Sequence, residues 1–160
     1  MKKTLLIIMG LFLITGCGEK KEENNLDVKL NMNEIKGNLS SIKIGDGNPY
    51  NEMDSVNDLE LIDGYGIDVT LLEDYVIYIS SSVEDPSMYM VLKVSEENKS
   101  VVKYQVDDMF SQYLSAYKGY YPEAATIIED KMEKEYNGYL IYIVSNDNQI
   151  VYDEILDCKE

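Results

Sequence analysis

The stretch "DYVIYISSSVEDPSMYMVLKV", residues 74–94, decides the fold because it predicts two β-strands joined by a turn. Residues 74–80 and 87–94 are rich in Val, Ile, Tyr and Met, and a cluster of Ser, Glu, Asp and Pro separates them. Successive side chains of a strand point to opposite faces, so alternate residues define a face. In the second strand one such face is wholly apolar and should be fully buried: Met88, Met90, Leu92 and Val94.

The clearest helix pattern follows this hairpin, at residues 96–118. Its apolar residues recur at steps of three and four, which places them on one stripe that faces a core. Gly119 and then Pro122 predict the end of the helix. The stripe consists of Val102, Val106, Met109, Phe110, Tyr113 and Tyr117.

A second hairpin is predicted near the C-terminal end of the sequence. A strand at about residues 126–135 precedes the dipeptide Asn-Gly at 137–138, which is a strong signal for a tight turn. The next strand, YLIYIV at 139–144, is continuously apolar, which indicates a central position in the sheet. Residues 145–156 predict a final helix.

The elements before residue 74 are less regular. Residues 33–42 predict a short helix, 44–51 have the composition of a loop, and 52–61 predict one or two further helical turns. Apolar residues alternate at 26–32, and this pattern is compatible with an additional edge strand. We therefore expect one α+β domain over residues 31–160, with a single antiparallel sheet of four to five strands and helices packed on one face, in the order α-β-β-α-β-β-α.

The N-terminal residues predict a secretory signal. Lys2 and Lys3 precede an apolar run from Leu5 to about Ile14, which is shorter than the roughly 20 residues that a membrane-spanning helix needs. A charged, Asn-containing segment follows it.

The junction Ile14-Thr15-Gly16-Cys17 resembles the lipobox of bacterial lipoproteins. The resemblance implies that residues 1–16 are a signal peptide, cleaved between Gly16 and Cys17, and that Cys17 carries the lipid. Two acyl chains, such as palmitate, anchor a protein stably where one does not. Residues 17–30 would then tether the domain to the outer face of the cell membrane.

Composition excludes several functions. The chain has 14 basic and 30 acidic residues, a net charge of −16 that disfavours nucleic acid as a partner. Every basic residue is Lys and histidine is absent, which removes Ser-His-Asp and Cys-His catalysis and His-ligated zinc sites. Cys158 lacks a disulfide partner if Cys17 is lipidated.

Several segments together resemble a family of small lipoproteins of Gram-positive bacteria, domain of unknown function 4358. The resemblance covers most of the chain from about residue 60. It implies a membrane-anchored extracytoplasmic domain and supplies no catalytic residues. The matching segments are YGID (65–68), DYVIYIS (74–80) before a strand ending in LKV (92–94), the long helix, YYPE (120–123) and NGYLIYIVSND (137–147).

Tyrosine is the most conspicuous candidate for binding, since the chain has 14 Tyr against two Phe and no Trp. Tyr rings with polar tips suit contacts with sugars or proteins. We take Tyr120, Tyr121 and Glu123 as a candidate binding surface, and the alternative is that tyrosine serves as the aromatic core residue. No residue pattern fits a metal site, a cofactor site or a catalytic nucleophile; Ser40 and Lys43 match S-x-x-K by spacing alone.

The sequence therefore favours a non-enzymatic, lipid-anchored module that binds a membrane-proximal protein or a cell-wall component. The alternative is a carboxylate-dependent glycan hydrolase of the cell envelope, because 30 acidic residues always leave some pair at a useful separation. A small-solute receptor ranks last, because a single domain lacks the two lobes of a clamshell binder.

Overall fold

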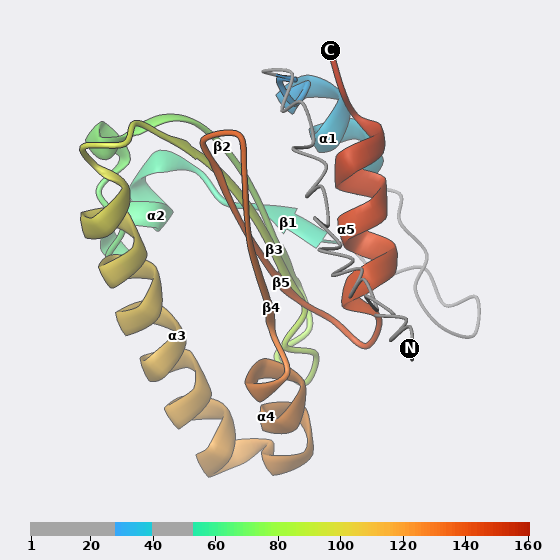
Figure 1. Cartoon of the computed structure of the whole chain (residues 1–160). Helices are drawn as coiled ribbons and strands as arrows, with labels where there is room; N and C mark the ends of the chain where they lie inside the picture. The colour runs from blue at the N-terminus through green and yellow to red at the C-terminus, as the bar shows by residue number, and fades with distance from the viewer. Residues whose placement is uncertain (1–27, 40–52) are drawn as a thin grey trace, which may run out of the picture.

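A five-stranded antiparallel sheet forms the centre of the protein, in the order β1-β2-β3-β5-β4 (Figure 1). The computed structural model describes residues 28–39 and 53–160. The α+β class and the single antiparallel sheet are confirmed. The strands are β1 (Met53–Ser55), β2 (Leu72–Ser80), β3 (Met88–Val94), β4 (Met132–Tyr136) and β5 (Tyr139–Val144).

Both predicted hairpins are present. β2 pairs with β3, and β4 pairs with β5 through a two-residue turn in which Asn137 and Gly138 have φ of 45° and 83°. Asn and Gly tolerate this left-handed conformation, which matches the twist of the flanking strands. β5 lies between β3 and β4, so the prediction that it is a central strand is confirmed.

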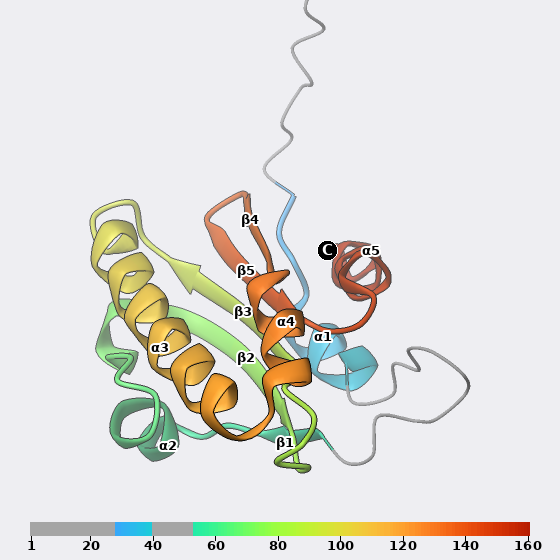
Figure 2. The same ribbon diagram turned by 90° about the horizontal axis from the view of Figure 1, so that it is seen from below.

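Helices cover both faces of the sheet, and the prediction that they pack on one face is wrong (Figures 1 and 2). On one face lie α2 (Asp58–Asp63), α3 (Lys99–Tyr120) and α4 (Pro122–Glu129). On the other lie α1 (Met32–Leu39) and α5 (Asn148–Asp157). The physical reason is that β3 and β5 carry apolar side chains on both faces, including Tyr89, Val91 and Ile141, which must also be removed from water.

The long helix and its successor differ from the prediction. α3 passes through Gly119 to Tyr120, and Tyr121 with ψ of 67° then breaks the helical backbone. Pro122 starts α4, because proline suits the first position of a helix, where its missing N–H is not needed. The predicted strand at 126–135 is therefore wrong in its first half, and only its second half forms β4.

The segment before β2 contains a strand that the sequence did not reveal. Met53–Ser55 forms β1, while the predicted helical turns begin only at Asp58, in α2. Asn57 caps α2 through its side chain, and Glu60 bonds back to the Asn57 amide, so that a complete capping box fixes the helix start.

Residues 28–31 run beside the C-terminal residues, at the end of the sheet that carries the Asn137–Gly138 turn (Figure 2). The sequence left open an additional edge strand at residues 26–32. Among the described residues of that range, Leu30 forms only an isolated antiparallel bridge, with Lys159. We call this end of the sheet, where Tyr136 and Tyr139 lie, the hairpin end. The predicted signal peptide, Gly16, Cys17 and the loop at 44–51 lie outside the described residues.

Candidate functional site

Tyrosine side chains gather at the end of the sheet opposite the hairpin end, where α3 finishes and α4 begins. We call this the tyrosine end; it comprises Tyr113, Tyr117, Tyr120 and Tyr121. α3 connects the two ends because it starts just after β3 at the hairpin end (Figure 1). At 1.5 Å per residue its 22 residues span about 33 Å.

Three of these rings pack together, and two of them contact the β2–β3 loop. The centroids of Tyr113 and Tyr117 are 4.7 Å apart in an edge-on arrangement, and Tyr121 lies 5.8 Å from Tyr117. The Tyr117 hydroxyl donates to the Asp85 carbonyl at 3.4 Å, while the Tyr113 hydroxyl lies 3.4 Å from the Pro86 carbonyl. Burial raises the pKa of both hydroxyls, so they remain neutral donors that hold this loop against α3.

The predicted surface residues have different environments. Tyr120 is 82 % exposed, and Glu123 is also exposed in the first turn of α4. Tyr121 is half-buried because its ring packs on Tyr117. The structure brings all three to the tyrosine end, but Tyr121 also belongs to the packed rings. Buried tyrosines are common here, which matches the alternative that tyrosine serves as the core aromatic: Tyr78, Tyr89, Tyr117, Tyr139 and Tyr142.

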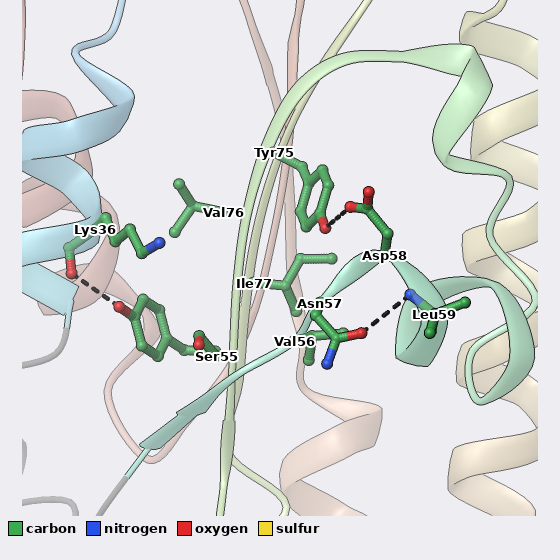
Figure 3. A pocket seen from close by; sticks show the side chains of 10 residues that line it. Lys36, Ser55, Val56, Asn57, Asp58, Leu59, Tyr75, Val76 and Ile77 are labelled. Carbon is green, nitrogen blue, oxygen red and sulfur yellow. Dashed lines mark hydrogen bonds between the residues drawn. The ribbon is translucent and has the colours of Figure 1, made fainter.

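A groove that the sequence did not reveal lies along the outer edge of β2 (Figure 3). Its volume is about 500 Å³, and its floor is formed by β2 from Tyr75 to Tyr78. Lys36 of α1 lies on one side of this edge, and Asp58 and Leu59 of α2 lie on the other (Figure 3). We call it the β2-edge groove.

Two hydrogen bonds brace the walls of the β2-edge groove. The Tyr75 hydroxyl donates to the Asp58 carboxylate, which ties α2 to the sheet, and the Tyr78 hydroxyl donates to the Lys36 carbonyl at 3.1 Å (Figure 3). Burial, followed by the hydrogen bond and charge of Asp58, raises the pKa of Tyr75 to about 12. Tyr75 is therefore a neutral donor near pH 7.

A second depression of about 840 Å³ adjoins this groove and shares Ser55, Val56 and Leu59 with it. Leu59 is 71 % exposed and stands between the two. The second depression also contains acidic side chains and the Tyr65 ring. Together the two hollows form a partly apolar, acidic surface with a single lining lysine, Lys36; the acids are Asp54, Asp58, Glu60 and Asp63.

The sequence did not predict the β2-edge groove, because the groove depends on the pairing of β1 with β2, which are separated by α2 in the sequence. β1 is only three residues long and has no β-rich pattern, so nothing local indicated that β2 would be only partly covered. One local signal was present: Asn57 followed by Glu60 is a capping-box pattern that places the start of a helix at Asp58.

Cys158 is fully buried between α1 and α5. Its thiol donates to the Glu154 carbonyl at 3.3 Å, and its Sγ accepts from the Asn38 side chain at 3.2 Å. Burial raises the pKa of the thiol above its ordinary value. A neutral, enclosed thiol of this kind is a packing group rather than a nucleophile.

Two further observations concern ligands and membranes. Over residues 28–39 and 53–160, no three His, Cys, Asp or Glu side chains lie close enough together to hold a metal ion. Within the same ranges, no helix combines the length and the apolar character that crossing a bilayer requires. Gly16 and Cys17, the predicted processing residues, lie outside these ranges.

Comparison with known proteins gives one match. A family model described as Domain of unknown function (DUF4358) matches residues 46–145. This range spans β1 to β5; it includes α2 on one side of the β2-edge groove but not α1 on the other. No curated protein and no solved structure matches the chain.

Proposed function

Because the chain belongs to the DUF4358 family, whose description assigns no activity, we propose a function from its own residues: a lipid-anchored, extracytoplasmic module that binds a partner at the cell envelope. The anchor is the lipid on Cys17, after cleavage at Gly16. The module is the domain that begins near residue 28, and its tyrosine end lies away from the anchored end.

The observation that carries this proposal is the position of residues 28–31. The Asn31 amide donates to the Cys158 carbonyl at 2.8 Å, and the Glu160 amide donates to the Lys29 carbonyl at 3.0 Å. The Tyr139 hydroxyl lies 3.3 Å from both the amide and the carbonyl of Leu30. The chain therefore enters the domain at a fixed point on the hairpin end.

This entry point limits how far the hairpin end can lie from a membrane that holds the lipid. Eleven residue steps separate Cys17 from Val28, so the entry point lies at most about 40 Å from the lipidated residue. The tyrosine end lies a further helix length away. A partner that contacts Tyr120 would thus approach from the side that faces away from the membrane.

Two of the described carboxyl groups, Asp68 and Glu135, do not fit the general acid of a hydrolase. A glycosidase needs one carboxyl group with a raised pKa to act as the general acid. The pKa of two carboxyl groups is lowered: that of Asp68 by its hydrogen bonds with Thr70, and that of Glu135 by its hydrogen bond and charge pairing with Lys103. Neither is suited to donate a proton.

Site-specific photo-crosslinking in intact cells tests the proposal. A crosslinking amino acid replaces Tyr120 at the tyrosine end, Leu59 at the groove, or Gln149 on α5 as the matched exposed control. We expect one crosslinked species that depends on position 120 or 59 and is lost in a Cys17→Ala background. Lysis of cell-wall polymer by the purified protein in a zymogram would contradict the binding function and favour the hydrolase.

A further inference from the structure

We propose that the β2-edge groove docks an extended, basic segment of a partner protein, which adds to the sheet as a strand along Tyr75–Ile77. The inference deepens the proposed binding function and rests on it. It specifies where the partner binds and what its chemistry is.

The outer edge of β2 is only partly covered. β2 has nine residues, but β1 pairs with Tyr78, Ile79 and Ser80 alone. Directly after β1, the Val56 amide donates one further hydrogen bond to the Ile77 carbonyl, at 3.1 Å. The chain then leaves the sheet and forms α2. In the described ranges, no strand lies beside Leu72–Val76 on this side.

Backbone groups of β2 point into this open edge. Alternate residues of a strand direct their N–H and C=O groups to the same side. The Ile77 carbonyl faces outward, since it accepts from Val56, so Tyr75 faces outward as well. The Tyr75 amide already donates to Asp74 Oδ1, at 2.8 Å. The Tyr75 carbonyl and the Ile77 amide point to the open side. Such groups are the template for an added strand.

The groove has the two-sided shape that an added strand needs. Side chains of a bound strand would alternate between the α1 side, where Lys36 extends towards Val76, and the α2 side, with Tyr75 and Leu59 (Figure 3). Leu59 is exposed and offers an apolar contact on the second side.

Charge selects a basic occupant. Five acids surround the edge, and none takes part in the ion pairs found among the described residues: Asp54, Asp58, Glu60, Asp63 and Asp74. The opposite edge strand, β4, differs because Lys103 pairs with Glu135 and Lys131 with Glu133. Paired charges of that kind protect an edge strand from further pairing, whereas an edge with five acids and one lysine, Lys36, attracts lysine or arginine. A second copy of this chain would carry a net charge of −16 and be repelled.

The test uses a dye-labelled heptapeptide, Lys-Val-Lys-Val-Lys-Val-Lys, with acetylated and amidated ends, and the full chain in neutral detergent micelles. We expect saturable binding by fluorescence anisotropy and slower hydrogen–deuterium exchange in the peptic fragment that contains Tyr75–Ile77. A peptide of identical charge, N-methylated at alternate amides, should bind at least tenfold more weakly, because it cannot pair with a strand. Equal binding of the two peptides, protection at β4 instead, or no binding would overturn the proposal.

Matched variants separate the groove from general attraction. Asp58→Asn and Asp74→Asn keep the side-chain oxygen that accepts the local hydrogen bond but remove the charge, and each should weaken peptide binding several-fold. Asp153→Asn on α5 removes the same charge elsewhere and should leave affinity unchanged. Equal weakening by all three, or a concentration-dependent dimer that protects the same fragment, would contradict a basic partner at this edge. The mass of the same sample reports the lipid on Cys17, so failure here is distinct from failure of the anchoring proposal.

Discussion

At the scale of single residues, Tyr139 joins the first described segment to the sheet. Its side chain is 3 % exposed, and its hydroxyl lies 3.3 Å from both the amide and the carbonyl of Leu30. It thereby holds the entry point of the chain at the hairpin end, although Leu30 and Tyr139 are 109 positions apart.

Tyr139→Phe tests this role. Removal of the hydroxyl leaves buried backbone groups of Leu30 without their partner, which should lower the free energy of unfolding by about 1–3 kcal/mol. Urea denaturation measures the change. Tyr104→Phe is the matched control, because Tyr104 is exposed and its loss of a hydroxyl should have almost no effect. Equal stability of wild type and Tyr139→Phe would show that Leu30 is not held in this way.

Tyr75 gives the protein a pH dependence of known sign. Its pKa is raised from 10.0 to about 12 by burial and by Asp58, so the folded state retains the proton that the unfolded state loses. This group therefore stabilises the fold fully below pH 10, and that contribution is lost as the pH rises from 10 to about 12. We expect Tyr75→Phe to be less stable at pH 8 but to lose less stability over that interval. Parallel curves for the two proteins, by urea denaturation at several pH values, would contradict the assignment.

At the scale of elements, two glycines should respond to substitution with opposite signs. Gly66 has φ of +68° in the turn after α2, whereas Gly119 lies in the last turn of α3 with open space where a Cβ would be. Gly66→Ala should destabilise the protein by about 1 kcal/mol because it forces a left-handed backbone on alanine. Gly119→Ala should stabilise it by about 0.5 kcal/mol because alanine favours the helix. Thermal unfolding of both variants measures this, and a shift of equal sign would contradict these backbone roles.

The sequence predicted the elements whose signal is local. The strand at 74–80, the strand at 87–94, the long helix and the Asn137–Gly138 turn all show a periodicity or a turn dipeptide that needs no knowledge of distant contacts. The start of α4 was missed because Pro122 was interpreted only as the end of a helix, although proline equally suits the first turn of the next one.

At the scale of the whole molecule, the features that the sequence did not predict depend on contacts between segments far apart in the chain. Helices cover both faces because β3 is buried on each side. The second face of β3 carries Tyr89 and Val91 but also Lys93, so the sequence indicated only one buried face. The β2-edge groove exists because β1 ends after three residues. Of the predicted surface, Tyr120, Tyr121 and Glu123 do meet at the tyrosine end, and their role in binding stays a prediction.

The orientation proposed for the domain depends on the covalent state of Cys17. In the proposed arrangement, a diacylated Cys17 would keep the hairpin end near the membrane and leave the tyrosine end accessible to a partner.

Mass spectrometry of the protein extracted from native membranes tests this most directly. We predict a chain that begins at residue 17, with two acyl chains added through the Cys17 sulfur. A chain that still begins at Met1, or a residue 17 with an unmodified thiol, would contradict the account.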